Sequence, residues 1–270
     1  MAAIYEEQMT IFLDFLGFSE ASVQSDEAAQ MQMLTLLTAI SSMRSEFSDK
    51  SDPDTGSTRA IRLNPTITTF SDHIVASYPI GRLSGNGDES AKLSLAYFSA
   101  TQLIAKIAAA ALPFGFLIRG GLSYGKLYHS SGVVFGAAMI EAYNLESKSA
   151  IYPRVVVSPT LLKRCQSIAL GGMVRGGHDG IGSVDYFTFL VGAGCPTGPE
   201  HHACVKAWFD TVVPIMKKNI AQLKDAGNLN ALSKWVWFSK AFAETLRRTN
   251  PAILKASQIS ADDMAWAMLA

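Results

Sequence analysis

Two aspartates in the first third of the chain could share one metal site. Asp14 interrupts the apolar run MTIFLDF at 9–15, and Asp72 lies in the centre, Ser71-Asp72, of the stretch ITTFSDHIVA at 67–76. The apolar arms of that stretch predict a β-hairpin with Asp72 in its turn. Asp and Ser suit turns through local side-chain to backbone bonds, so turn chemistry is one explanation. A metal ligand is the other.

The apolar run around Asp14 is typical of a central strand that is covered on both faces. If the hairpin pairs with this strand, the two strands lie about 5 Å apart, and both carboxylates can reach one cation or a pair. Two cations about 3.5–4 Å apart activate the attacking and the leaving oxygen of phosphoryl transfer. The turn that follows Asp14 offers backbone N–H groups to a phosphate. That turn contains Phe15, Leu16, Gly17, Phe18 and Ser19.

Helical spacing and turn residues predict the elements that would position these acids. A helix begins near Ser25-Asp26-Glu27, and polar loops cover 48–60 and 83–90. In this first helix, the residues at helical spacing are Met31, Leu34, Leu37 and Ser41. A second helix ends at Pro113. Its buried face is expected to contain Leu93, Tyr97, Ala100, Ile104, Ile107 and Ala111.

The remaining segments predict a second hairpin that turns at Gly125, a helix over 136–147, a strand over 154–157, a short helix from Pro159 and a last strand over 184–191. The order βαββαββαβ(α)β favours an α+β fold of ferredoxin-like type, with helices packed on an antiparallel-rich sheet. We expect this catalytic domain to span 1–195. Residues 196–270 then form a helical extension, packed on the core or at a dimer interface.

Two strongly amphipathic helices are predicted in that extension. Their apolar positions are Val205, Trp208, Phe209, Val212, Val213 and Met216 in the first, and Leu232, Trp235, Phe238, Phe242 and Leu246 in the second. The tryptophans are expected to be core or interface residues rather than platforms for stacked bases.

The composition restricts the class of protein and its partners. The chain has 270 residues, of which 49% are hydrophobic, and its net charge is zero. Nothing in this balance favours nucleic acid or an anionic membrane as a partner. The apolar stretch 103–118 contains Lys106 and Pro113 and is too short for a membrane span, so it predicts a buried helix that leads into a strand. Three cysteines argue against a disulfide framework and fit the cytoplasm.

Four motifs resemble, in order, those of class III nucleotidyl cyclases over residues 9–191. The stretch IFLDFLGFS at 11–19 resembles the family's first strand, and TTFSDHIVA at 68–76 resembles the hairpin with the second metal ligand, where the family usually has Gly-Asp. LIRGGLSYG at 117–125 resembles the strand usually written Arg-(apolar)-Gly-Ile-His-x-Gly. GAAMIEAYNLE at 136–146 falls where the family has a Gly-led helix with transition-state residues.

The resemblance implies roles for individual residues. Asp14 and Asp72 would ligate two divalent cations, Mn²⁺ or Mg²⁺, with the main-chain carbonyl of Phe15 as a further ligand. One cation would lower the pKa of the ribose 3′-hydroxyl, and the other would neutralise the triphosphate and the departing pyrophosphate. Arg119 would contact the phosphates, a task that suits a guanidinium group. A surface arginine at a strand end is the alternative for Arg119.

Departures from the family pattern bear on the substrate. Adenylate cyclases read the base with a Lys in the second-metal hairpin and an Asp before the Gly-led helix, but this chain has Thr68 and Val133 there. Neither can pair with the adenine edge, so we do not expect an ordinary adenylate or guanylate cyclase. Ile140 occupies the position of the ribose-orienting Asn, and Asn144 occupies that of the transition-state Arg. The chain is therefore either a degenerate cyclase or a divergent one.

Retention of both acids favours the divergent cyclase, and the chain resembles the pyrimidine cyclases of Pycsar anti-phage systems. This resemblance implies a cytoplasmic homodimer with composite active sites that makes cyclic UMP or cyclic CMP from UTP or CTP. It also implies a downstream effector that responds to the cyclic nucleotide. UTP is favoured over CTP by family frequency alone. The alternatives are a catalytically inactive cyclase-fold nucleotide sensor or dimerisation module, and an unrelated two-metal phosphohydrolase or polymerase-palm enzyme.

Other candidate sites are weaker. The segment from Cys195 to Cys204 contains His201 and His202, but its spacing matches no familiar zinc motif. The dipeptide His178-Asp179 lies in a Gly-rich turn and is interpreted as structural. By strand alternation, His73 is expected to point away from Asp72, to the opposite side of the strand.

Overall fold

The computed structural model describes residues 4–23, 26–46, 65–82, 89–165, 173–192 and 200–249. The strands are β1 (Glu6–Leu16), β2 (Thr66–Phe70), β3 (His73–Pro79), β4 (Leu117–Ser130), β5 (Val133–Phe135), β6 (Val155–Val157), β7 (Val174–Gly176) and β8 (Gly182–Val184). The helices are α1 (Phe18–Val23), α2 (Glu27–Glu46), α3 (Glu89–Ala111), α4 (Ala137–Ser149), α5 (Pro159–Cys165), α6 (Phe187–Val191), α7 (His201–Asp225) and α8 (Leu229–Thr249), with short 3₁₀ turns η1 (Ile80–Arg82) and η2 (Leu112–Phe114). The loop expected over 48–60 and most of that over 83–90 lie outside the described residues.

The first four strands form a ferredoxin-like core. In space they follow the order β2-β3-β1-β4, and each neighbouring pair is antiparallel. Along the chain, α2 connects β1 to the β2–β3 hairpin, and α3 connects that hairpin to β4. This is the βαββαβ arrangement that the order of elements predicts. The predicted α+β architecture with C-terminal helices is confirmed.

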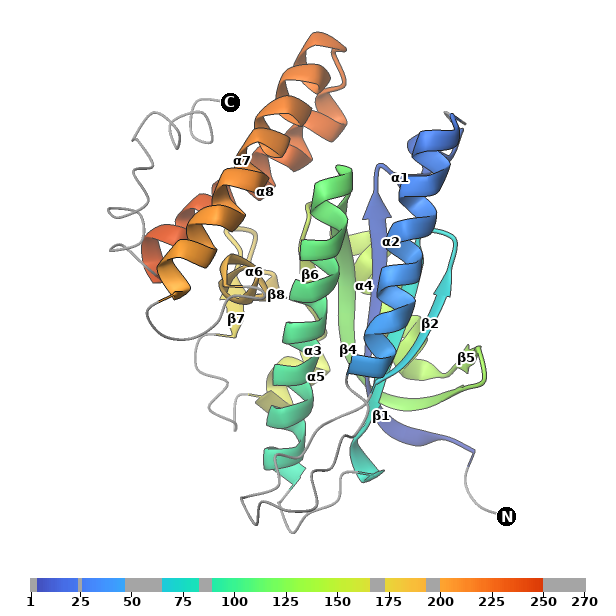
Figure 1. Ribbon diagram of the computed structural model, residues 1–270. Helices are drawn as coiled ribbons and strands as arrows, with labels where there is room; N and C mark the ends of the chain where they lie inside the picture. Colours follow the sequence, from blue (N-terminus) through green and yellow to red (C-terminus); the bar gives the residue numbers. More distant parts are fainter. Residues whose placement is uncertain are drawn as a thin grey trace.

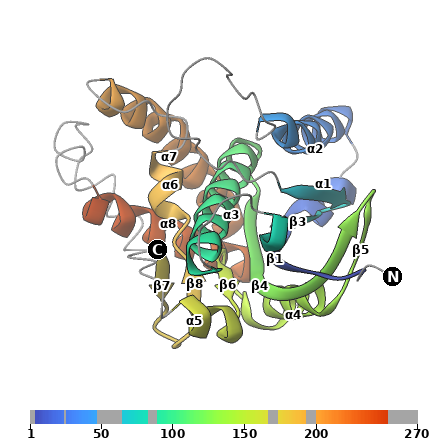
Figure 2. The ribbon, with the colours of Figure 1, turned by 90° about the horizontal axis from the view of Figure 1, so that it is seen from below.

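The sheet continues beyond β4 with a different geometry. After the crossover through α4, β6 pairs parallel to β4, and β8 and β7 add antiparallel strands. The views in Figure 1 and Figure 2 show α2 and α3 on one face of the sheet and α4 on the other. The central strand β1 is therefore covered on both faces, and residues 8–15 are all buried.

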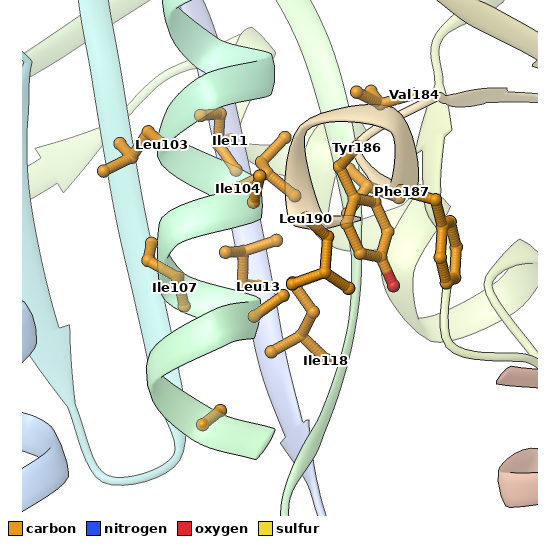
Figure 3. Close-up of a cluster of buried hydrophobic side chains, with 14 of the residues drawn as sticks. Ile11, Leu13, Leu103, Ile104, Ile107, Ile118, Val184, Tyr186, Phe187 and Leu190 are labelled. Atoms are coloured by element: carbon orange, nitrogen blue, oxygen red, sulfur yellow. The ribbon is translucent and has the colours of Figure 1, made fainter. Parts of the chain in front are cut away.

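The main core lies between the sheet and α3. Figure 3 shows Leu103, Ile104 and Ile107 of α3 facing Ile11 and Leu13 of β1, with Leu190 of α6 beside them. Helix α3 is long and apolar enough to cross a membrane by length and composition. However, 61% of its 18-residue apolar segment is buried inside the structure. All six residues expected on its buried face are buried, so α3 is the expected core helix.

Strand β4 differs from the predicted hairpin at Gly125. The strand runs without interruption from Leu117 to Ser130, because Gly125 pairs with Gln8 and the ladder with β1 continues to Leu127. The turn lies at Ser131-Gly132, where φ is 52° and 79°. Two consecutive positive φ values match the type I′ turn that favours two-residue hairpins.

One further expectation about local structure is wrong. Residues 184–191 end β8 and then form α6 rather than a strand, and α6 contacts α3 and α8. A short apolar run suits a strand or a buried helix equally, so tertiary packing decides. Helix α2 is present as predicted, and its buried residues are Met33, Leu36 and Ile40, whereas Met31 and Leu34 are exposed.

The C-terminal helices α7 and α8 form an antiparallel pair beside α3 (Figure 1). Their apolar faces join the same hydrophobic core as the sheet, which includes Trp235, while Trp208 and Trp237 pack against it. The tryptophans are thus packing residues, as expected. No disulfide framework was expected, but Cys204 in α7 is disulfide-bonded.

Candidate active site

Asp14 lies in a row of three ionisable side chains across three strands. In the β1–β3 ladder it is directly opposite His73, and in the β1–β4 ladder it is directly opposite Arg119. Directly opposite residues project from the same face of a sheet. Arg119 Nε donates a hydrogen bond of 2.8 Å to Asp14 Oδ2, and His73 Nε2 lies 3.8 Å from Asp14 Oδ1. The fold thus places two basic side chains against one buried acid.

Asp72 reaches the same place from the β2–β3 turn. The two-residue turn is tight, with Ser71 in the left-handed region at φ 54°, and the Phe15 N–H donates to the Asp72 carbonyl at 3.1 Å. The Asp72 side chain accepts a hydrogen bond from Ser19 Oγ at 3.3 Å. Two predictions from the residues are confirmed: the hairpin has Asp72 in its turn, and strand pairing brings it beside Asp14.

Arg119 is held by a second acid from α4. Its Nη2 atom forms an ion pair of 2.8 Å with Glu146 Oε1, while its Nε binds Asp14. The Glu146 side chain is buried, and this burial raises the pKa of its carboxyl, although the positive charge of Arg119 opposes the rise. Arg119 is therefore a fixed part of the site rather than a solvated arginine at a strand end.

The donor atoms of this site fit a divalent cation. Asp14, Asp72 and His73 each offer one ligand atom, and these three atoms all lie within 4.8 Å of one another. Carboxylate oxygens suit Mg²⁺ and Mn²⁺, and imidazole suits first-row transition ions. Among the parts of the chain that the structure describes, this is the one group of three or more such side chains with that spacing.

The predicted phosphate turn lies directly beside the acids. Leu16 ends β1, Gly17 adopts φ 94°, and Phe18 begins α1 with its ring buried against Phe15 and Phe116. This packing fixes the path of the turn, and Ser19 contacts Asp72. Contact of the turn with a phosphate stays a prediction.

Other predicted site residues do not reach Asp14 within one chain. Thr68 lies on β2, two strands away, and its Oγ1 is 2.9 Å from His129 Nε2. Val133 is exposed on β5, at the far end of β4 from Arg119. On α4, the residues that face the sheet are Ala138, Ala142 and Glu146. Ile140 and Asn144 lie on the other side of that helix, and Ile140 is 62% exposed.

Sequence reasoning missed His73 and Glu146. The expectation that His73 points away from Asp72 is wrong, because Asp72 belongs to the turn and the alternation of the strand begins only at His73. A two-residue turn pairs Phe70 with His73, and that register could have placed the ring on the face of Asp14. Glu146 follows Ala138 and Ala142 at intervals of four residues, and this spacing places all three on one face of the helix. That pattern could have indicated that Glu146 faces the sheet.

The Gly-rich turn around Asp179 is structural, as interpreted. Asp179 binds the buried Arg154, with 2.5 Å from Oδ2 to Nη2, and this bond lowers the pKa of Asp179 to about 2. Residues 195–199, which include Cys195, lie outside the described residues, so the zinc interpretation there stays untested.

Comparisons with known proteins find similarity among solved structures. No protein-family model and no curated protein matches the sequence. Among solved structures, the adenylyl cyclase CyaB from P. aeruginosa has a TM-score of 0.45 and 15% identity, covering 67% of this chain and 94% of that chain. The fold is defined by the strand order and pairing given above.

Proposed function

We propose that this protein is a nucleotide cyclase that converts UTP or CTP to the 3′,5′-cyclic monophosphate and pyrophosphate, with UTP favoured. The observation that supports it best is the meeting of Asp14 and Asp72 at the end of the central strand, beside Arg119, within a ferredoxin-like core. The cyclase-like motifs and the lack of purine-reading side chains at Thr68 and Val133 are the second support. A cytoplasmic location and a role in antiviral signalling through a separate effector are part of the same proposal.

In the proposed reaction, the acids hold the cations and the arginine binds phosphate. The 3′-oxygen of the ribose bonds to the α-phosphorus, and the bond from that phosphorus to the oxygen that bridges to the β-phosphorus breaks. That oxygen leaves with the pyrophosphate, and the hydroxyl proton passes to solvent water. Asp14 and Asp72 would hold the divalent cations, Mn²⁺ or Mg²⁺, two per site, with the Phe15 carbonyl as a further ligand. A bound cation supplies charge that lowers the pKa of the hydroxyl and neutralises the phosphates. Arg119, fixed by Glu146, neutralises phosphate charge from the β4 side.

A product assay tests the proposal directly. The purified protein is incubated with each of the four nucleoside triphosphates and Mn²⁺, and products are identified by mass spectrometry. We expect cyclic UMP or cyclic CMP together with pyrophosphate. Orthophosphate or a linear dinucleotide would instead identify a two-metal phosphohydrolase or a polymerase-type enzyme. Binding of triphosphates without any product would identify an inactive cyclase-fold sensor.

The inactive sensor is the second candidate, and one observation favours it. The positions of the usual ribose-orienting and transition-state side chains hold Ile140 and Asn144, and α4 directs both away from the sheet that carries Asp14. Within a single chain, therefore, neither the ribose-orienting position nor the transition-state position contributes a side chain near Asp14.

A homodimer with composite sites resolves this difficulty within the cyclase proposal. Exposed apolar side chains lie near Asp14 and His73: Phe70 and Tyr143 both contact Phe12 and remain partly exposed, as does Ile140 on α4. A second copy that covers them would bring its own α4 to the acids. Size-exclusion chromatography with light scattering is expected to show a dimer.

Mixed dimers test whether the sites are composite. Asp14→Asn and Asn144→Ala variants are each expected to be inactive or strongly impaired. A mixed dimer has one site in which both residues are intact, so co-expression should restore activity. No restoration, despite dimers that form, would contradict composite sites.

A further inference from the structure

We propose that His73 is a protein ligand of the cation site, that it binds through Nε2, and that this nitrogen makes the site prefer first-row transition ions to Mg²⁺. The inference rests on the proposed metal-dependent function and adds a ligand to the two carboxylates and the Phe15 carbonyl. It follows from the register of β1 and β3, the hydrogen bonding of the imidazole and the packing of its ring.

The register of the sheet places the imidazole against the acid. His73 and Asp14 are directly opposite in the β1–β3 ladder, and Nε2 lies 3.8 Å from Asp14 Oδ1. Metal bonds to imidazole nitrogen and to carboxylate oxygen are each about 2.0–2.2 Å long. A cation can therefore bind both atoms at this separation, without any change in strand pairing. Arg119 binds the other oxygen, Oδ2, so Oδ1 is the atom that faces His73.

The hydrogen bonding of the ring determines which nitrogen is available. Nδ1 of His73 lies 2.9 Å from Asp72 Oδ1, which is hydrogen-bond distance. An ionised carboxylate only accepts, so Nδ1 must carry the proton in this contact. In the neutral imidazole, Nε2 then has a lone pair directed at the Asp14 side. Metal-binding histidines generally donate their other ring N–H to a carboxylate or carbonyl in this way.

Two aromatic rings hold the imidazole in this orientation. Phe70 stacks on it with centroids 5.4 Å apart and planes 16° apart, and Phe12 lies 5.2 Å away on β1. Such packing limits rotation of the ring about its own side-chain bonds. Nε2 is therefore pre-positioned before an ion arrives, which reduces the entropy lost on binding.

The chemistry of the donor set gives the expected selectivity. Mg²⁺ requires near-octahedral oxygen coordination and keeps several waters, whereas imidazole suits first-row transition ions. Replacing one oxygen ligand by Nε2 should therefore favour Mn²⁺ over Mg²⁺. Removing the nitrogen should weaken Mn²⁺ binding more than Mg²⁺ binding.

Electron spin-echo spectroscopy of bound Mn²⁺ tests the ligand without relying on activity. The full chain with Mn²⁺ is expected to show ¹⁴N modulation from a coordinated imidazole. His73→Gln should abolish that modulation and raise the Kd for Mn²⁺ at least about 10-fold, with a change below about 3-fold for Mg²⁺. His178→Gln is the matched control, because His178 is exposed in a turn outside the site, and it should behave as the unmodified protein does.

The outcomes separate this inference from the proposed function. Bound Mn²⁺ without ¹⁴N modulation in the unmodified protein overturns the role of His73, even if His73→Gln fails to fold. A persistent ¹⁴N signal in His73→Gln, or equal weakening of both ions, also overturns it. Clear ¹⁴N coupling in a protein that makes no cyclic nucleotide supports the ligand and contradicts the cyclase. No binding of either ion to the unmodified protein overturns both.

Discussion

At the scale of single residues, two acids bind one arginine at the end of β1, and a third acid lies beside them. Asp14 and Glu146 bind Arg119, and Asp72 lies beside them through His73. Alanine at Asp14 or Asp72 removes a proposed metal ligand, so we expect turnover to fall by at least about 100-fold while the fold is kept. Steady-state kinetics with circular dichroism measure both. The control Asp210→Ala removes an exposed acid on α7 and should retain activity.

Glu146 gives a prediction about pH. Burial raises the pKa of its carboxyl above the ordinary value of 4.5, so the folded protein releases this proton later than the unfolded chain does. The stability that this group contributes is present at low pH and is lost as pH rises through the folded-state pKa. The stability of the unmodified protein relative to Glu146→Gln should therefore fall over the pH range that lies above the ordinary value of 4.5. Urea unfolding at several pH values measures this difference, and an increase over that range would contradict the assignment.

The sequence allowed prediction of both aspartates but not of their partners. Asp14 and Asp72 stand out because each interrupts an apolar pattern, and their meeting required only that the hairpin pair with the first strand. His73 and Glu146 depend on register and on the face that α4 presents, and these depend on contacts between distant segments. Arg119 was expected to contact phosphate, whereas its ion pair with Glu146 appears only once α4 is packed on β4.

At the scale of elements, Gly121 lets α4 pack directly against β4. A Cβ atom added there would lie 2.2 Å from the Ala142 carbonyl oxygen and 2.8 Å from Leu145 Cβ, both on α4. Gly121→Ala must therefore displace the helix that carries Glu146, and we expect a loss of about 1–3 kcal/mol in unfolding free energy. Gly125→Ala on the same strand meets only Ala138 Cβ at 3.9 Å and should be nearly neutral. Equal losses in urea unfolding would contradict the close-packing explanation.

Elements with long regular patterns could be predicted, and short or ambiguous ones could not. Helices α3, α7 and α8 have clear apolar faces, and the β2–β3 hairpin has a clear turn. In α2 two apolar sets fit helical spacing, so the choice of Met33, Leu36 and Ile40 depends on the sheet beneath. The continuation of β4 through Gly125 depends on its ladder with β1, a pairing that no local pattern encodes.

At the scale of the whole molecule, the C-terminal helices are part of the same core as the sheet. Phe238 of α8 is buried and contacts Phe187 of α6 with ring centroids 5.3 Å apart. Phe238→Ala should lower the free energy of unfolding by about 3–5 kcal/mol, through the cavity it leaves. Leu229→Ala on the same helix is the control, because Leu229 is 74% exposed and its truncation should cost little. Urea unfolding of both variants makes the comparison.

The number of unfolding transitions gives a sharper test of the shared core. A shared core predicts a single unfolding transition for probes on α8 and on the sheet, and two separate transitions would contradict it. The sequence predicted the ferredoxin-like order, but it left open whether the helices cover the core or a dimer interface. An apolar helix face indicates burial, and only the packed structure identifies the surface that buries it.

The pairing of β1 with β4 has a consequence for biosynthesis. Asp14 and Arg119 are separated by 105 positions in the chain, yet they are direct neighbours in the sheet. A ribosome that adds 5–20 residues per second needs about 5–20 s to cover that interval. During this time the apolar strand MTIFLDF is already made and lacks the neighbour that covers one of its edges. The nascent chain is therefore prone to aggregation, and chaperones that shield this strand should raise the yield of folded protein.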